Sequence, residues 1–216
     1  MNTDKATTDE LGALDTIYRR RSVRAYAPEM PDDASIHRLL DAAVQAPTAL
    51  HEEAWRFVVV QDRALLKRLS DRAKAVRLEL EAQRATPSAA HPSDRFRDPE
   101  FNIFYDAGTL IVIAARPTSE FATADCWLAA ENLMLAATAL GLGSCCVGFA
   151  LPALRLPDVK AELGLPNGIN AVAAIIVGGP RGTTPPVQRR PPEVLRWVRP
   201  AVDGSPHAAA HRAPER

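Results

Sequence analysis

The chain has 216 residues, and its 26 Lys and Arg residues balance 26 Asp and Glu residues to a formal net charge of zero. A neutral chain is not a polycation built to coat nucleic acid or an anionic membrane, so we expect neither as a partner. Hydrophobic residues make up 47% and charged residues 24%, which is ordinary for a globular protein, and the length suits one domain with appendages.

The first part of the chain predicts the order helix, helix, strand, helix. Thr7-x-x-Glu10 has the pattern of a capping box, and apolar residues follow it at helical spacing. The acidic pair at 32–33 opens a second amphipathic stretch. The elements expected are a helix ending near Arg20, a helix between Asp32 and Pro47, a strand over residues 55–60 and a helix over residues 63–81.

The second part of the chain alternates strands and helices after a polar segment. Residues 82–100 are polar and carry three prolines, and we expect a variable loop there that acts as a lid, since long loops in compact domains usually have a function. Strands are expected over residues 108–115, 144–148 and 171–177, and helices over residues 122–140 and 152–163. The strand over 108–115 is almost uniformly apolar, which predicts a sheet covered on both faces.

We expect one domain over residues 10–199, between a flexible segment, residues 1–9, and a disordered tail, residues 200–216. The last part of the domain, residues 180–199, is rich in proline and is expected to form an extended arm without a core of its own. The first ten residues lack the apolar stretch of a signal peptide, and the three cysteines include no C-x-x-C pair. We therefore expect a cytoplasmic protein with buried free thiols.

Four arginines, Arg19, Arg20, Arg21 and Arg24, lie where the first helix should end. One interpretation is that they complement the helix macrodipole and are otherwise solvated. The other is an oxyanion site, because arginine side chains pair bidentately with phosphate and Ser22 adds a hydroxyl. The residues alone leave both interpretations open.

Residues 141–148 read Gly-Leu-Gly-Ser-Cys-Cys-Val-Gly. They match neither a dinucleotide fingerprint nor a nucleophile elbow, because Cys146 stands where each motif requires a glycine. What remains is a glycine-lined turn from helix to strand, which is either a plain helix cap or a place where backbone amides approach a flat ligand. No metal is predicted, since His51-Glu52-Glu53 lacks the H-E-x-x-H pattern and the other histidines have no ligand spacing.

Four segments, taken in order, resemble the flavin-dependent nitroreductase family over roughly residues 10–198. Residues 17–24, Ile-Tyr-Arg-Arg-Arg-Ser-Val-Arg, resemble the R-R-S-x-R opening of the family. Residues 46–57 resemble its A-P-S-x-x-N-x-Q-P-W-x-F segment, and residues 131–144 resemble its Q-N-L-x-L-A-A…G-L-G-S helix and turn. Arg189-Arg190-Pro191 with Trp197 resembles its C-terminal R-x-P…W arm.

The resemblance implies an α+β fold of three layers, in which helices wrap a mixed, mainly antiparallel central sheet, in a homodimer with swapped terminal arms. One FMN would lie in each of two clefts at the interface, with NAD(P)H as the reductant. The residues expected to bind FMN are Arg20, Arg21, Ser22, Arg24, Pro47, Thr48, His51, Ser144, Cys145, Cys146, Gly148, Arg189 and Arg190.

By the same resemblance, different residues of this set would bind different parts of the flavin. Residues 20–22 and the returning Arg189 would hold the phosphate and the ribityl chain, and Arg24 would lie by the pyrimidine edge. Pro47 and Thr48 would come from the partner subunit, and residues 143–148 would face the ring near N5. No protein acid or base is expected, because the flavin itself carries the hydride, and Arg24 would act electrostatically.

Four residues depart from the family pattern. His51, Glu53 and Ala54 stand where the family commonly has Asn, Gln and Pro, and Glu131 replaces a Gln. A carboxylate beside the flavin would oppose negative charge on the reduced ring unless it is turned away or paired. The roles of His51 and Glu53 are left open by this departure.

The function implied is an FMN-dependent oxidoreductase that takes hydride from NADH or NADPH and reduces a nitroaromatic, a quinone or a similar electrophile by a ping-pong mechanism. Lys74 or Arg77, before the lid, are alternative cations for the pyrimidine edge. Two other functions stay open. One is a dehalogenase-like or flavin-cleaving enzyme of the same fold, in which the lid supplies residues to the substrate. The other is a non-catalytic flavin-binding protein.

Overall fold

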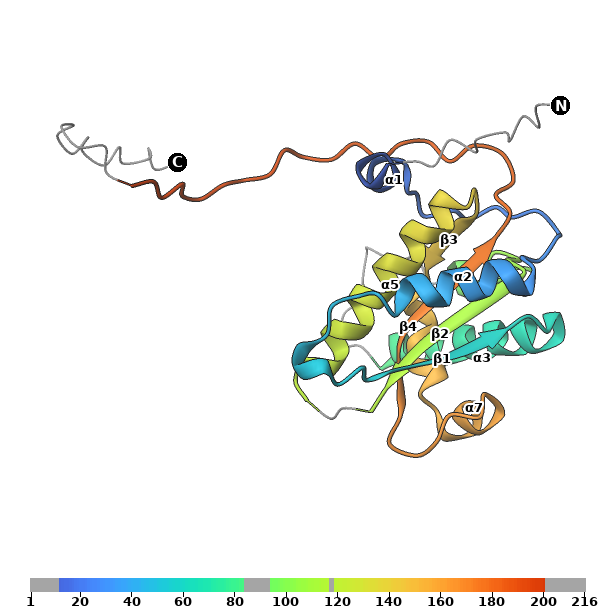
Figure 1. The fold of residues 1–216 in the computed structure, drawn as a ribbon. Coiled ribbons are helices and arrows are strands. Elements are labelled where there is room, and N and C mark those ends of the chain that lie inside the picture. The colour runs from blue at the N-terminus through green and yellow to red at the C-terminus, as the bar shows by residue number, and fades with distance from the viewer. Residues whose placement is uncertain (1–11, 84–93, 117–118, 201–216) are drawn as a thin grey trace, which may run out of the picture. The chain divides into compact units, whose positions relative to one another are not determined.

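A four-stranded sheet with helices on both faces positions the site (Figure 1). The computed structural model describes residues 12–83, 94–116 and 119–200. The chain divides into two units, residues 1–186 and residues 187–216, and the sheet belongs to the first. In the second unit the described residues, 187–200, are exposed and form neither helix nor strand.

The strands lie in the order β1 (Trp55–Val60), β2 (Thr109–Ala115), β4 (Asn170–Gly178) and β3 (Gly143–Cys146), each antiparallel to its neighbour. Among the described residues the one parallel pairing is the isolated bridge of Ser22 with Ser144. With this bridge the sheet is mixed and mainly antiparallel, as predicted.

Each face of the sheet has its own core. Leu110 and Val112 of β2 point to one face, and Ile111 and Ile113 point to the other, because side chains alternate along a strand. All seven residues of β2 are buried, which confirms that the sheet is covered on both faces.

The helices divide between the two faces. On one face α2 (Asp33–Ala43) and α5 (Ala122–Ala139) cover the sheet, and α1 (Ala13–Arg19) contacts α5. The other face carries α3 (Arg63–Ala82), α6 (Leu151–Leu154) and α7 (Pro157–Glu162). The short α4 (Asp94–Arg97) packs on α3. Two 3-10 turns, η1 (Ala49–His51) and η2 (Gly148–Ala150), follow α2 and β3.

Local sequence explains where the helices begin. Asp32 accepts a hydrogen bond from the Ser35 amide at 2.8 Å, and Asp62 accepts one from the Leu65 amide at 2.7 Å. Each bond satisfies a free amide in the first turn of α2 or α3. The hydrogen bonds from Ser35 also lower the pKa of Asp32.

The sequence predictions match β1, α3 and α5 to within one residue. The helix predicted over 152–163 is two helices, because Leu156 is extended before Pro157, whose ring disfavours a helical residue in front of it. The strand predicted over 144–148 ends at Cys146, and η2 takes the residues after it. The helix α2 ends at Ala43 rather than near Pro47.

Several predicted segments fall wholly or partly outside the described residues. These are the capping box at Thr7 and Glu10, the N-terminal segment 1–9, residues 84–93 of the expected lid and residues 201–216 of the expected tail. The described end of the lid segment contains α4.

Candidate active site

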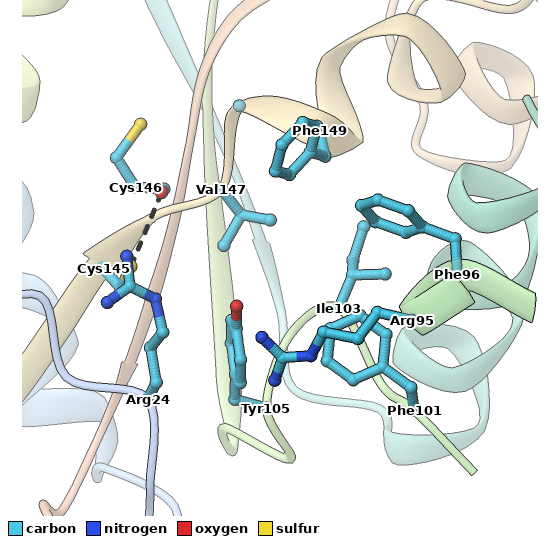
Figure 2. A pocket seen from close by; sticks show the side chains of 11 residues that line it. Arg24, Arg95, Phe96, Phe101, Ile103, Tyr105, Cys145, Cys146, Val147 and Phe149 are labelled. Atoms are coloured by element: carbon cyan, nitrogen blue, oxygen red, sulfur yellow. Dashed lines mark hydrogen bonds between the residues drawn. The ribbon is translucent and has the colours of Figure 1, made fainter. Parts of the chain in front are cut away.

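A cavity of about 400 Å³ lies in the first unit, between two walls that come from different parts of the chain (Figure 2). The first, which we call the β3 wall, consists of Arg24 and residues 145–148. The second, the α4 wall, consists of Arg95, Phe96, Phe101, Ile103 and Tyr105. Phe149 also lines the cavity. The volume is in the range of small-molecule sites.

Backbone contacts build the β3 wall. The Val23 amide donates to the Ser144 carbonyl at 3.0 Å, which places residues 22–24 alongside β3. Gly143 makes this approach possible, because a Cβ there would lie 2.8 Å from a Val23 methyl carbon. The Tyr26 hydroxyl donates to the Val23 carbonyl at 2.8 Å and closes the segment on itself.

Arg24 brings a positive charge to the β3 wall. Its guanidinium carbon lies 5.9 Å from the Tyr105 ring centre, and no carboxylate pairs with it in the described part of the chain. Burial raises the pKa of the neighbouring Cys145 thiol, and Arg24, Ser22 and Arg20 only partly offset this effect. The thiol is therefore neutral at neutral pH, and Arg24 is the charged group of this wall.

Aromatic rings and a second arginine make up the α4 wall. The Arg95 guanidinium carbon lies 4.5 Å from the Phe101 ring centre and 5.9 Å from that of Tyr105. Phe96 packs edge-on against Phe149, with ring centres 5.2 Å apart. This wall offers flat apolar surfaces with one cation beside them.

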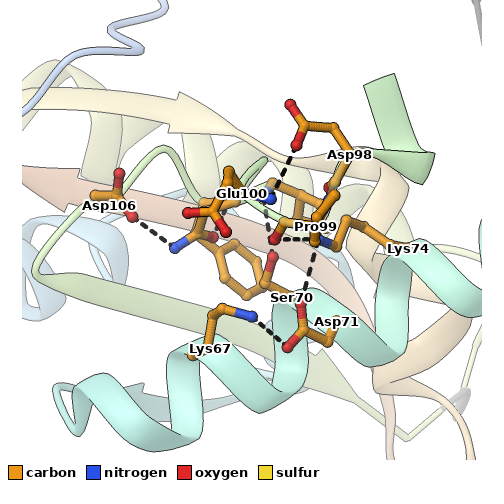
Figure 3. Close-up of polar contacts among 11 residues, drawn as sticks. Lys67, Ser70, Asp71, Lys74, Asp98, Pro99, Glu100 and Asp106 are labelled. Atoms are coloured by element: carbon orange, nitrogen blue, oxygen red, sulfur yellow. Dashed lines mark hydrogen bonds and ion pairs between the residues drawn. The ribbon is translucent and has the colours of Figure 1, made fainter. Parts of the chain in front are cut away.

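Side chains of α3 hold the α4 wall in place (Figure 3). Lys74 is buried, and its ammonium donates to the carbonyls of Asp98 at 3.1 Å and Pro99 at 3.3 Å. The Ser70 hydroxyl accepts the Ile103 amide at 3.0 Å. These bonds fix the segment that carries Phe101, Ile103 and Tyr105.

Neither alternative cation for the flavin lines the cavity. Lys74 is engaged with the α4 wall, as described above, and with Asp71 at 3.2 Å. Arg77 pairs with Glu81 at 2.8 Å, and its guanidinium lies over the Phe149 ring at 5.1 Å. Both side chains therefore support the aromatic wall from behind.

The arginine cluster is partly occupied by contacts within the chain. Arg20 Nε lies 3.4 Å from the Glu131 carboxylate, so the residue that departs from the family pattern is paired. Arg21 donates to the carbonyls of Tyr18 at 2.6 Å and Arg20 at 2.8 Å, where it satisfies the end of α1. The exposed Arg19 ends α1 itself.

The loop with Pro47, Thr48 and His51 does not line the cavity of its own chain. The Ala49 amide donates to Asp125 at 3.3 Å, near the start of α5, whereas Ser144 follows the end of that helix. The described contacts of the loop are therefore with the start of α5, and those of residues 22–24 are with β3.

The same loop has an unusual backbone. Leu50, His51 and Glu53 all have φ between 43° and 55°, a left-handed conformation that is rare for such residues. Strain of this kind gathers at functional sites. Two of the three residues, His51 and Glu53, are departures from the family pattern.

The remaining predicted residues have different surroundings. Ser144 is buried beneath the wall rather than lining the cavity, and its hydroxyl has no hydrogen-bond partner among the described residues. Cys145, Cys146 and Gly148 line the cavity, and their predicted contact with FMN stays a prediction. Arg189 and Arg190 are exposed and belong to the second unit, so their predicted role stays a prediction.

The sequence predictions named no single residue of the α4 wall, although the expected lid over residues 82–100 contains Arg95 and Phe96, which line the cavity. A compositional signal was present, because four of the chain's six Phe, three Tyr and three Trp residues fall between residues 96 and 105. Such clustering in a chain poor in aromatics marks a segment with a packing or binding role.

Two other kinds of site are absent from the residues that the structure describes. These residues contain no group of three or more His, Cys, Asp or Glu side chains placed to hold a metal ion. None of their helices is long and apolar enough to cross a membrane.

The nitroreductase family model matches residues 17–179 of the chain. A protein of Archaeoglobus fulgidus, provisionally named an NADH dehydrogenase/NAD(P)H nitroreductase, is 31% identical over 78% of this chain and 85% of its own length. An iodotyrosine deiodinase of Thermotoga neapolitana is 25% identical over 81% of this chain and 92% of its own. A nitroreductase from Bacteroides fragilis, solved with bound FMN, superposes with a TM-score of 0.75 at 28% identity, covering 88% of this chain and all of that one.

Proposed function

Because the chain belongs to the nitroreductase family, we propose that it is an FMN-dependent oxidoreductase that takes hydride from NADH or NADPH and reduces a nitroaromatic, quinone or similar electrophile. The single observation that carries the proposal is the cavity, where Arg24 and the end of β3 face an aromatic wall. The solved relative with bound FMN supports the choice of cofactor.

The residues of the β3 wall fit a flavin ring. A Cβ built on Gly148 would meet nothing within 4 Å, so the backbone there is open to the cavity and can lie against a flat ring. Arg24 adds a cation without a carboxylate partner in the described residues, which suits an electron-rich ring edge. The buried Ser144 hydroxyl beneath the wall also lacks a partner there.

The phosphate end fits less completely in one chain. Arg20 is shared with Glu131, and Arg21 is bonded to the end of α1. A phosphate would therefore have to draw Arg20 away from Glu131, and we assign this role to Arg20 and Ser22 with the predicted return of Arg189.

When bound, FMN supplies the redox chemistry, since its ring accepts a hydride and afterwards passes two electrons to the electrophile. As a cation lining the cavity, Arg24 would stabilise negative charge on the reduced cofactor. The β3 wall excludes water from one side of the cavity, and the α4 wall leaves flat surfaces for the substrate. For a nitro substrate, two electrons and two protons give a nitroso product and water.

The working enzyme is proposed to be a homodimer. Pro47, Thr48 and His51 do not line the cavity of their own chain, so we assign them to the flavin that a second copy binds. Large apolar side chains on α1 and α5 are exposed in the single chain, among them Tyr18 at 72% and Leu128 at 45%. Burial of such faces is typical of obligate dimers.

One experiment tests the proposed function. Purified protein loaded with FMN is mixed with NADH or with NADPH in a stopped-flow instrument, and bleaching of the flavin is followed. We expect bleaching by at least one reductant, and parallel double-reciprocal plots with a nitroaromatic oxidant. Arg24→Leu should slow bleaching about tenfold or more while weakening FMN binding less. Protein that takes up no FMN, or bound flavin that neither reductant bleaches, would refute the proposal.

Reductive dehalogenation is the second candidate, and the similarity to the iodotyrosine deiodinase favours it. There a carbon–iodine bond breaks, two electrons and a proton give the C–H bond, and iodide leaves. Release of iodide from an iodophenol, with NAD(P)H consumed in equal amount, would select this candidate over nitro or quinone reduction.

A further inference from the structure

The cavity has a second cation that the proposed flavin chemistry does not use. Arg24 and Arg95 are its only charged lining residues in the described part of the chain, and no carboxylate lines it. Arg24 belongs to the β3 wall, which is assigned to the flavin. Arg95 belongs to the opposite wall, where the substrate would enter (Figure 2).

Ring contacts hold Arg95 in place without neutralising it. Its guanidinium lies over the Phe101 ring at 4.5 Å and beside the Tyr105 ring at 5.9 Å. Within the described residues no carboxylate pairs with it, whereas Arg97 on the same helix pairs with Asp94 at 3.3 Å. A stacked guanidinium keeps its N–H donors in a fixed plane, ready for a bidentate partner.

The aromatic rings around Arg95 determine the shape of the ligand that this arginine can bind. Phe101 and Tyr105 pack edge-on with ring centres 5.8 Å apart, and Phe96 packs edge-on against both Phe101 and Phe149. Flat aromatic ligands bind well against such rings. The guanidinium covers a face of Phe101, so the α4 wall presents its other rings to a planar ligand, with a fixed cation among them.

We propose that Arg95 selects a planar aromatic oxidant that carries a carboxylate, which its guanidinium binds while the ring lies on the aromatic wall. The inference rests on the proposed function, because it names the substrate class of the same cavity. NAD(P)H also joins a planar ring to anionic groups, so the test separates the oxidant from the coenzyme.

Equilibrium binding gives the first test. Benzoate and benzamide have the same shape and differ in charge, and calorimetry measures the affinity of each for the purified protein with its flavin. We expect benzoate to bind about tenfold tighter, the low end for a hydrogen bond to a charged group. Arg95→Gln should bring this ratio close to one, and the control Arg97→Gln should keep it. A ratio near one in the unaltered protein would overturn the proposal.

Turnover gives the second test. We expect Arg95→Gln to raise the Michaelis constant for para-nitrobenzoate about tenfold relative to the constant for para-nitrobenzamide, with little change in the ratio of their kcat values. The reductants compared are NADH and a neutral N-benzyl dihydronicotinamide. If Arg95→Gln changes only the ratio of these two reductants, Arg95 binds the coenzyme and the proposal is wrong.

The outcomes separate this inference from the proposed function. Bleaching of the flavin by NAD(P)H in the unaltered protein supports the function whatever Arg95 does. Calorimetry needs no turnover, so it reports on Arg95 even if neither reductant bleaches the flavin.

Discussion

The two walls of the cavity are held together by different kinds of interaction. The β3 wall is a piece of backbone architecture, in which residues 22–24 hydrogen-bond to β3 across a glycine. The α4 wall is held by side chains, chiefly the Lys74 ammonium and the Ser70 hydroxyl, and by stacked rings. A wall held by backbone hydrogen bonds keeps its shape when its side chains are substituted. A wall held by side-chain contacts changes shape when those side chains are substituted.

This difference suits walls with separate roles, one for the cofactor and one for the substrate. The cofactor would be the same in every turnover, and the β3 wall provides a surface that depends on few side chains. The substrate would lie against the α4 wall, where replacing one ring or one cation alters shape and charge without disturbing the sheet. We expect substitutions on the two walls to have separable effects.

The largest effect is expected from Gly143→Ala in the β3 wall. The new Cβ would lie between 2.8 and 2.9 Å from three carbons of Val23, a stiff β-branched residue that cannot rotate away. We expect a loss of about 3 kcal/mol in the free energy of unfolding, the upper end for overpacking, together with loss of FMN binding. Denaturant unfolding and flavin titration measure the two.

Gly148→Ala is the matched control, because a Cβ there meets nothing within 4 Å. Its free energy of unfolding should lie within about 0.5 to 1 kcal/mol of that of the unaltered protein. If Gly143→Ala is equally mild, close approach of residues 22–24 to β3 does not build this wall.

The α4 wall is tested by Lys74→Met. The substitution removes the donor to the Asp98 and Pro99 carbonyls from a buried position, and we expect a cost of about 2 kcal/mol in unfolding. The control Lys67→Met breaks an exposed pair with the same Asp71 and should cost about 0.5 kcal/mol or less. Flavin binding should change little in either variant, and its loss in Lys74→Met would contradict the separation of the walls.

The same substitution has a dependence on pH. Partial burial would raise the pKa of Asp71, but the hydrogen bonds from Lys67 and Lys74 outweigh it and lower the pKa. Because the pKa of Asp71 is lower in the folded state than in the unfolded state, this carboxylate stabilises the fold at pH values above its unfolded-state pKa, near 4. The stabilisation is lost as the pH falls through the folded-state pKa. Lys74→Met should therefore lose less stability on acidification than the unaltered protein, which unfolding curves between pH 6 and pH 3 would show.

A smaller effect is expected from the arginine beside the β3 wall. Arg20→Ala should weaken FMN binding by about 1.5 kcal/mol, the low end for a bond to a charged group, because Glu131 already shares this guanidinium. Riboflavin, which lacks the phosphate, should be unaffected. Arg19→Ala is the control and should be near neutral, since Arg19 is exposed at the end of α1.

Glu131→Gln tests the same competition for Arg20, and here we expect FMN binding to become stronger. Freed from the carboxylate, Arg20 should bind the phosphate more strongly, and FMN affinity should rise by up to about fivefold, the range of a partly exposed ion pair. Riboflavin again serves as the reference. Weaker FMN binding in this variant would mean that Glu131 orients Arg20 rather than competing for it.

The sequence singled out residues of the β3 wall, whereas for the α4 wall it indicated only a lid over residues 82–100 and no single residue, for physical reasons. Gly143 and the arginines before it form local patterns whose backbone requirements can be recognised in the chain. Arg95 and Tyr105 meet only because Lys74 and Ser70, from a different helix, hold the segment between them. The Arg20–Glu131 pair likewise joins residues far apart in sequence. The sequence therefore showed that Glu131 departs from the family pattern, but it did not show that Arg20 is the partner of Glu131.

The smallest effect is expected from Cys146→Ser on the β3 wall. If this wall acts through its backbone, the variant should bind FMN within about twofold and be reduced at nearly the same rate. Burial, with a further contribution from Cys145, raises the pKa of the Cys146 thiol, so no thiolate is present near neutral pH. Flavin reduction should therefore show no titration between pH 6 and pH 8 that depends on this residue. A rate that falls below pH 8 in the unaltered protein but not in Cys146→Ser would show that a thiolate contributes, and the wall would then depend on its side chains as the α4 wall does.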